Sequence, residues 1–150
     1  AQAALPHLKK TAPGSCLLNT ASAAGIYGTS GASVYSATKF GVRAITESLD
    51  AEWAEYGINV RSIMPSFIDT PLINHNPNDR SNASIREQVL SSGLEITPVS
   101  EVGEAAWQAV HGDKLHTTVG KTAKRVAFAA RWMPGKMRKE ARKRAALGVD

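Results

Sequence analysis

The sequence has little cysteine, few aromatic residues and no long apolar run. Its 150 residues include one cysteine and 6% Phe, Trp and Tyr. Cys16 cannot form an internal disulfide, and its apolar neighbours predict a small core residue in a protein of a reducing compartment. No apolar stretch reaches the roughly 18 residues of a membrane span, and the N-terminus lacks the charged start and apolar core of a signal peptide. We therefore expect a cytoplasmic protein.

Local motifs for binding metals or phosphates are also missing. The four histidines are scattered, without a spacing such as H-x-x-x-H, so they are expected on the surface or in loops and no metal site is predicted. No G-x-G-x-x-G pattern follows a predicted strand, which leaves no local cradle for a dinucleotide pyrophosphate. Gly25, Gly28 and Gly31 are expected as turn residues instead.

Charge is distributed unevenly along the chain. Residues 1–120 contain eight Lys and Arg against eleven Asp and Glu, whereas residues 121–150 contain ten against two, so the net charge of +5 arises in the C-terminal segment. Three interpretations of this segment stay open: a solvated helix that caps a substrate pocket or an oligomer edge, a helix on an anionic membrane surface, and a nucleic-acid-binding segment. No recognition motif accompanies the charge, so nucleic acid is the least favoured partner.

Hydrophobic periodicity and turn residues predict alternating helices and strands. The last turns of a helix are expected at residues 1–10. A buried strand is predicted at residues 15–20, a long helix at 34–56 and a second strand at 58–64. Gly57 stops the long helix. A strand, a helix and a strand in this order imply a parallel crossover connection.

The following segments are more polar. Residues 70–97 surround a short helix near residues 85–92, and a long polar segment in a compact domain is usually functional or mobile. A helix ending near His111 should follow, then a short strand at residues 117–119. Residues 121–147 predict a basic helical tail, interrupted at a Met-Pro-Gly sequence.

Tyr35 and Lys39 form a Y-x-x-x-K pair on one face of the predicted long helix. A phenol is a poor base at neutral pH, but an ammonium group one turn away favours the phenolate and makes the tyrosine a usable general acid or base. Ser22 closes the preceding strand, where its hydroxyl can face the crevice in which open α/β sheets bind ligands. It is a candidate to hydrogen-bond a substrate oxygen that Tyr35 protonates. The alternatives are a solvated helix face for the pair and a strand-end cap for Ser22.

Together with the sequence around them, Ser22, Tyr35 and Lys39 form a pattern that resembles the short-chain dehydrogenase/reductase family. The family's pattern is a Ser, then Y-x-x-x-K about thirteen residues later, then a P-G-x-x-x-T loop. The matching residues are Ser22, Tyr35, Lys39, Pro65 and Thr70. The first strand also ends in N-T-A-S-x-x-G, and the second in M-P-S-F-I-D-T-P, where a serine replaces the glycine of the P-G pair. The resemblance extends from residue 1 to about residue 120.

The resemblance implies an α/β fold, a partial Rossmann-like doubly wound parallel sheet in three layers (αβα) with its N-terminal half missing. Residues 1–120 would form the C-terminal part of that domain, with a substrate loop at about 70–97, and residues 121–150 a basic helical tail of the same domain. The family's Gly-rich turn and a fourth catalytic residue, an asparagine, would precede residue 1. We therefore expect the C-terminal portion of a longer protein, inactive by itself.

By resemblance, the activity is a hydride transfer between NAD or NADP and a carbonyl or alcohol substrate, which the basic tail suggests is lipid-like. Tyr35 would exchange the proton, Lys39 would also bind the nicotinamide ribose, and Ser22 would polarise the substrate oxygen. The cofactor-binding residues would be Tyr35, Lys39, Pro65, Ile68 and Thr70.

A homo-oligomer is also implied, in which the long helix and the helix near Lys10 pair with their copies. Ala44, Leu49 and Ala51 on the outer side of the long helix are compatible with such contacts. Peripheral membrane contact through the tail is a further expectation. The competing hypothesis is a catalytically silent fragment, or an oligomerisation or scaffold module, with the same fold.

Overall fold

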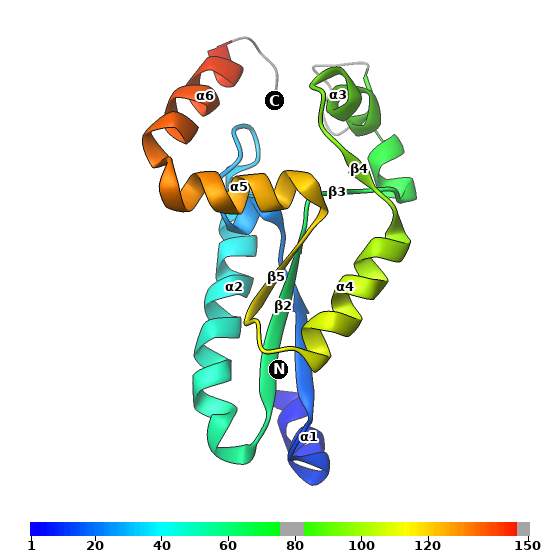
Figure 1. The fold of residues 1–150 in the computed structure, drawn as a ribbon, viewed down its shortest axis with the longest axis vertical. Coiled ribbons are helices and arrows are strands. Elements are labelled where there is room, and N and C mark those ends of the chain that lie inside the picture. Colours follow the sequence, from blue (N-terminus) through cyan, green and yellow to red (C-terminus); the bar gives the residue numbers. More distant parts are fainter. Residues whose placement is uncertain (76–82, 147–150) are drawn as a thin grey trace.

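The computed structural model describes residues 1–75 and 83–146 and has three layers, in which a parallel sheet lies between helices. In chain order the elements are η1 Gln2–Ala4, α1 Leu5–Thr11, β1 Cys16–Thr20, η2 Ala23–Gly25, α2 Ser33–Trp53, η3 Ala54–Tyr56, β2 Asn59–Pro65, β3 Phe67–Ile68, η4 Pro71–Asn74, α3 Ile85–Ser91, β4 Ile96–Thr97, α4 Val99–His111, β5 His116–Val119, α5 Gly120–Trp132 and α6 Pro134–Ala146. Helices α2 and α4 flank the sheet, and α5 lies across its upper end (Figure 1). The predicted α/β fold with a parallel sheet is confirmed.

The central strand of the sheet is β2, since the strand order is β1-β2-β5. It pairs in parallel with the whole of β1, and its second half pairs with β5, from Ser62 opposite His116 onward. Because helices cover both faces of β2 and both of its edges are paired from Ser62 onward, residues 60–64 are all buried. The two polar residues among them, Arg61 and Ser62, both have hydrogen-bond partners.

Two clusters of apolar side chains form the core. The buried members of the first are Trp53, Ile58 and Val60, and the partly buried residues around them are Leu5, Leu8, Ala12, Leu17 and Leu49. The buried members of the second are Ile63, Ala109 and Val119, and their partly buried neighbours are Leu18, Val102, Ala105 and Ala106. Consecutive residues of β1 thus enter different clusters, as the alternation of side chains along a strand requires.

Leu49 does not lie on the outer side of the long helix, where the sequence suggested an oligomer contact. Its side chain packs against the first core cluster. Ala44 and Ala51, the other two residues of that prediction, are exposed. The two alanines therefore lie on the exposed surface of α2, as expected, whereas Leu49 lies on the side of the helix that faces the core.

Local signals set the helix boundaries. Pro6 lies in the first turn of α1, where its missing N–H would have no helical partner, and a 3₁₀ turn precedes it, so the single helix expected at residues 1–10 is divided. After α2 and η3, Gly57 has a φ of 69°, a left-handed conformation that favours glycine. Ser84 and Glu87 form a capping box at the start of α3, in which each side chain accepts from the other's backbone N–H.

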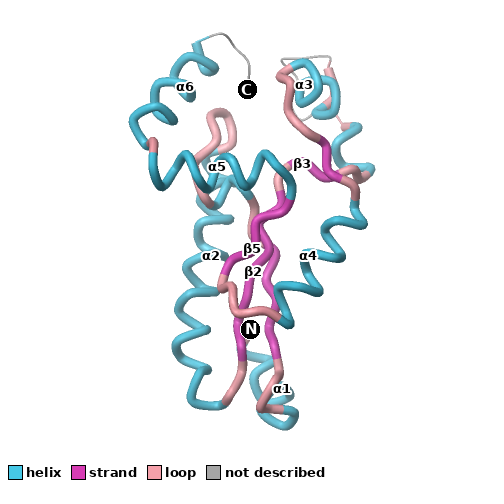
Figure 2. The backbone as a smooth tube through the Cα atoms, in the orientation of Figure 1, coloured by secondary structure: helices cyan, strands magenta, loops and turns pink. Residues whose placement is uncertain are grey.

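The two-residue strands β3 and β4 form a second parallel sheet that the sequence did not predict. Figure 2 shows this pair apart from the three main strands. The Asp69 amide extends the pairing by donating to the Thr97 carbonyl at 2.9 Å. Gly120, at the start of α5, has a φ of 84°, and a Cβ there would overlap the Thr97 hydroxyl. Strands of two residues have no readable hydrophobic period, so this junction leaves no pattern in the sequence.

A partly buried ion pair connects β2 to α2. Arg61 Nη1 donates to Asp50 Oδ1 at 2.6 Å, and the Val60 amide donates to the same oxygen at 3.1 Å. The side chain of Arg61 is 11% exposed and that of Asp50 33%. The same guanidinium acts on Cys16. Burial raises the pKa of the Cys16 thiol, and the positive charge of Arg61 partly opposes this rise. Removal of Asp50 would leave a buried cation without its counter-charge.

The Asp50→Ala variant is expected to lower the free energy of unfolding by about 2 kcal/mol for this reason. The loss falls short of that for a fully buried pair because a third of the Asp50 side chain faces solvent. Urea unfolding followed by circular dichroism measures it. The control is Glu52→Ala, which removes an exposed carboxylate from the same helix and should change stability by less than about 0.5 kcal/mol. Equal losses in the two variants would show that the ion pair contributes nothing of its own.

His116 connects three elements, and the prediction that it is a surface or loop residue is wrong. From β5, its Nδ1 lies 2.8 Å from Ser62 Oγ on β2, and its Nε2 lies 2.9 Å from Glu47 Oε1 on α2. Hydrogen bonds from His116 and then Arg43 hold the pKa of Glu47 below its ordinary value. Ser62 is fully buried, so this serine, histidine and glutamate attach β5 and α2 to the central strand and offer no accessible nucleophile.

The basic segment forms α5 and α6, which meet at Met133. Gly120 and Ala123 in the first turn of α5 are buried, whereas most described side chains of α6 are exposed. Within residues 1–75 and 83–146, no helix has both the length and the apolar character needed to cross a bilayer.

Candidate active site

Ser22 lies where β1 ends and the η2 turn begins. Its Oγ accepts a hydrogen bond from the Ala24 amide at 3.2 Å and donates to the Pro65 carbonyl, at the end of β2, at 3.4 Å. The strand-end cap that the sequence left open is therefore present. The second hydrogen bond is long and weak, so the hydroxyl can be redirected toward a ligand. Ser22 bridges the carboxyl ends of two parallel strands, the edge at which open α/β sheets bind ligands.

Tyr35 and Lys39 occupy the first two turns of α2. The Lys39 Nζ lies 5.6 Å from the centre of the Tyr35 ring and donates to the Thr20 carbonyl, the last of β1, at 3.1 Å. Tyr35 is 50% exposed, so its side chain is open to a ligand. Lys39 is thus held between Tyr35 and the strand end that leads into Ser22. Through this contact the structure brings the three candidate catalytic residues to one end of the sheet.

Close packing positions the loop between Ser22 and α2. Ser36 is buried, and its Oγ accepts from the Thr29 amide at 3.1 Å, which attaches the loop to the helix. Gly25 lies against the α2 backbone, where a Cβ would be 2.7 Å from the Lys39 carbonyl oxygen. Gly25 therefore does more than form a turn, because its missing side chain allows η2 to approach α2 at the candidate site.

The cofactor-loop candidates lie directly after the central strand. Pro65 ends β2, Ile68 belongs to β3 and Thr70 precedes η4. The Thr70 hydroxyl is 3.5 Å from the Ile68 carbonyl oxygen, which is a weak hydrogen bond. Ser66, at the position of the family's glycine, is half-buried. The loop leaves the sheet at the Pro65 carbonyl that Ser22 contacts, so both sets of candidates share this edge.

Sequence reasoning missed Arg86, on α3. It forms an ion pair with Asp69, and its Nε donates to Asn74 Oδ1 at 2.9 Å. These contacts attach α3 to the loop that follows β3. The paired residues are 17 positions apart and belong to no local motif, so the sequence contains no signal for their contact.

The arrangement suits proton transfer at a substrate oxygen. It combines an exposed phenol, a neighbouring ammonium group and a serine hydroxyl at the carboxyl end of a parallel sheet. A cavity of about 360 Å³ lies elsewhere, between α4, β5 and α5. In the part of the chain that the structure describes, no group of three or more His, Cys, Asp and Glu side chains is placed to hold a metal ion.

The sequence is similar to known oxidoreductases. The family model for short chain dehydrogenase matches residues 1–81. An uncharacterized oxidoreductase of Staphylococcus epidermidis is 45% identical over 71 residues, which are 47% of this chain and 30% of that protein. An uncharacterized oxidoreductase of Staphylococcus aureus (strain N315) is 43% identical over 81 residues, 53% of this chain and 35% of that protein. The chain spans about a third of the length of these relatives.

Solved structures share the fold over nearly the whole chain. One is a short chain dehydrogenase from Burkholderia cenocepacia in complex with NADP. The superposition covers 93% of this chain and 52% of that protein's chain, with a TM-score of 0.75 and 21% identity. For a short-chain dehydrogenase from Streptomyces avermitilis, the superposition covers 97% of this chain and 56% of that protein's chain, with a TM-score of 0.66 and 23% identity. At such identities the likeness concerns the fold alone. The chain spans about half of each of these structures.

Proposed function

The chain belongs to the short-chain dehydrogenase family, and from this premise we propose that the whole protein is an NAD- or NADP-dependent oxidoreductase that acts on carbonyl or alcohol substrates. The observation that carries the proposal is the placement of Ser22, Tyr35 and Lys39 at the carboxyl ends of β1 and β2. This placement supports a site in which Tyr35 donates a proton and Ser22 donates a hydrogen bond to one substrate oxygen, at the edge where open α/β sheets bind ligands.

In this proposal each residue has a separate task. Tyr35 gives a proton to the substrate oxygen in reduction or removes it in oxidation, and the Lys39 charge favours the phenolate. The ammonium group has three donors, of which the Thr20 carbonyl takes one, so others can reach a ribose hydroxyl. Ser22 exchanges its weak bond to the Pro65 carbonyl for one to the substrate oxygen, where it stabilises developing negative charge.

The residues around this edge fit the nicotinamide end of a cofactor. A bound NAD or NADP would supply or accept the hydride. Pro65, Ile68 and Thr70 belong to the loop that begins at the Pro65 carbonyl contacted by Ser22, and the weak hydrogen bond of the Thr70 hydroxyl lets it turn toward an amide. No Gly-rich strand, turn and helix occurs in residues 1–75 and 83–146, so those residues offer no pyrophosphate cradle. The NADP in the Burkholderia cenocepacia structure supports a nicotinamide cofactor without choosing between NAD and NADP.

We also propose that copies of the protein associate through α2. Ala44 and Ala51 are exposed there, as are the larger side chains of Val34, Phe40 and Ile45, which are 78%, 40% and 54% exposed. Apolar side chains on an exposed helix face are typical of a surface that packs against another helix. Leu49 takes no part in this surface.

The test is an assay of the whole protein with NADH and NADPH against short- and long-chain aldehydes and ketones, followed by cofactor absorbance. Calorimetric titration with the same cofactors measures binding separately. Cofactor binding with turnover of a carbonyl compound is the expected result. Binding without turnover of any substrate would favour the catalytically silent scaffold, and the absence of binding would overturn the proposed function.

A further inference from the structure

One face of α5 presents only basic and aromatic side chains. The exposed residues of α5 are Lys121, Lys124, Arg125, Phe128, Arg131 and Trp132. At about 100° per residue these positions fall within an arc of about 120°, and we refer to them as the α5 outer face. Helix α5 contains no acidic residue, and its buried Ala123 lies on the side of the helix opposite this face. The outer face is therefore the part of the helix that is free to meet a partner.

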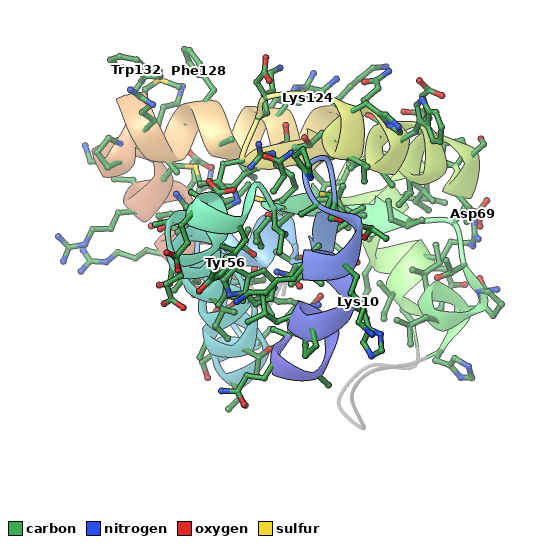
Figure 3. The ribbon with its side chains drawn as sticks, turned by 90° about the horizontal axis from the view of Figure 1, so that it is seen from below. Lys10, Tyr56, Asp69, Lys124, Phe128 and Trp132 are labelled. Carbon is green, nitrogen blue, oxygen red and sulfur yellow. The ribbon has the colours of Figure 1, made fainter. Side chains whose placement is uncertain are left out.

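Two aromatic rings project from this face without core packing to explain them. Phe128 is 59% exposed and Trp132, one turn later, is 65% exposed. Figure 3 shows both side chains pointing away from the rest of the molecule. The Arg131 guanidinium lies 5.2 Å from the centre of the Trp132 ring, so one of the rings has a cation beside it. Clustered exposed aromatic residues of this kind mark interaction sites more often than solvated surface.

The charge continues into α6. Its exposed basic residues are Lys136, Arg138, Lys139, Arg142 and Lys143. Glu140 is the one acidic residue of that helix. Such a surface attracts a polyanion, and each basic residue close to an anionic membrane strengthens binding by about fivefold.

We propose that the α5 outer face docks on an anionic phospholipid surface. The aromatic rings would enter the headgroup region, where Trp and other amphipathic side chains concentrate, while the flanking Lys and Arg contact phosphates. The outer side of a helix that packs on a protein is convex. A bilayer can lie against a convex surface, whereas a bound peptide usually requires a groove. The proposed contact is peripheral, because it uses one face of a helix whose Ala123 side is buried in the protein.

Docking would bring the candidate active site close to lipid. Helix α5 starts directly after β5 and contacts η2, the turn that Ser22 caps. Figure 1 shows α5 crossing the end of the sheet from which the candidate loops leave. A substrate drawn from the bilayer would therefore have a short path to that edge. This consequence rests on the proposed function, whereas docking itself does not.

The experiment measures co-sedimentation of the whole protein with vesicles of phosphatidylglycerol and phosphatidylcholine in equal parts, and with pure phosphatidylcholine vesicles. Binding to the anionic vesicles should be at least about tenfold tighter, and high salt should remove the difference. The Phe128→Ala, Trp132→Ala double variant should bind the anionic vesicles about tenfold more weakly. In a separate Lys124→Gln, Arg125→Gln variant we expect a loss of about 25-fold, because two basic residues are removed.

Trp107→Ala is the matched control. Trp107 is 66% exposed, as much as Trp132, but it lies on α4, a helix that contains no Lys or Arg, and its ring centroid is 4.0 Å from that of His111. Its removal should change vesicle binding by less than about twofold. Circular dichroism of each variant establishes that the fold is intact.

Four outcomes would overturn the proposal. The first is equal binding of the protein to both kinds of vesicle, and the second is an equal loss of binding in the Trp107 control. The third is a protein that does not bind vesicles and whose self-association is lost in the double variant. The fourth is a protein that does not bind vesicles but binds an oligonucleotide through the same residues. The third would identify a second copy of the chain as the partner, and the fourth a nucleic acid. None of these measurements uses the cofactor, so a failure here is distinguishable from a failure of the oxidoreductase assignment.

Discussion

The Tyr35→Phe variant of the whole protein is expected to lower kcat by about 10²- to 10⁴-fold, the usual contribution of a positioned general acid or base. The change removes one oxygen atom and leaves the ring, which is half exposed and contributes little to the core. Its backbone carbonyl still accepts from the Thr38 hydroxyl at 2.7 Å, so α2 should begin as before. The fold and the cofactor affinity should therefore stay close to those of the parent, and the loss should appear in kcat. Steady-state kinetics and calorimetric cofactor titration measure the two effects separately.

Tyr56→Phe is the control for this variant. Tyr56 also has an ammonium group over its ring, that of Lys9 at 3.3 Å, but it lies in η3, before the amino end of β2. Figure 3 labels this tyrosine on the side of the molecule near α1. Its variant should retain kcat within about twofold, because a tyrosine and lysine pair remote from the carboxyl edge of the sheet has no substrate to act on. An unchanged kcat in Tyr35→Phe would remove Tyr35 from the proposed proton transfer.

Gly25→Ala is expected to lower the free energy of unfolding by about 3 kcal/mol, because the new methyl group meets backbone atoms. Its Cβ would lie 2.7 Å from the Lys39 carbonyl oxygen and 3.0 Å from the carbonyl carbon. A side chain could rotate away, but a helix backbone cannot, so η2 or α2 must move. Movement there also displaces the Lys39 ammonium relative to Ser22. We therefore expect kcat of the folded fraction to fall by about tenfold or more, since small misplacements of catalytic groups are costly.

The same loop supplies the control for Gly25→Ala. Gly28 is exposed, and a Cβ built on it meets no atom within 4 Å. Gly28→Ala should change stability by less than about 0.5 kcal/mol and leave kcat unchanged. Urea unfolding and steady-state kinetics of both variants test the pair. If the two alanine variants behaved alike, the close approach of η2 to α2 would have no energetic significance.

The elements that could be predicted from the sequence each carry their own local signal. The strands around residues 16–20 and 59–65 are short apolar runs that end in small polar residues or proline, and the helix between them has a 3.6-residue period stopped by Gly57. Tyr35 and Lys39 could be recognised for the same reason, since one helical turn separates them. Signals of this kind depend only on neighbours in the chain.

The features that escaped prediction are contacts between distant residues. Nothing near Arg61 indicates that its counter-charge is Asp50, and nothing near Asp69 indicates Arg86. The approach of Gly25 to the α2 backbone likewise appears only after the chain has folded. Each of these contacts depends on where the elements pack, and composition and spacing do not encode that information locally.

The attachment of α3 has a consequence for how substrate range diverges within a lineage. Ser22, Tyr35 and Lys39 lie on elements packed around β2, whereas the Arg86 ion pair and its hydrogen bond fasten α3 from outside that frame. The α3 capping box also makes the helix start by itself. If Ser22, Tyr35 and Lys39 act as proposed, mutations in α3 would alter its surface without touching these three residues. Under the proposed function, this arrangement would let substrate preference change in α3 while the proposed chemistry stays on the sheet.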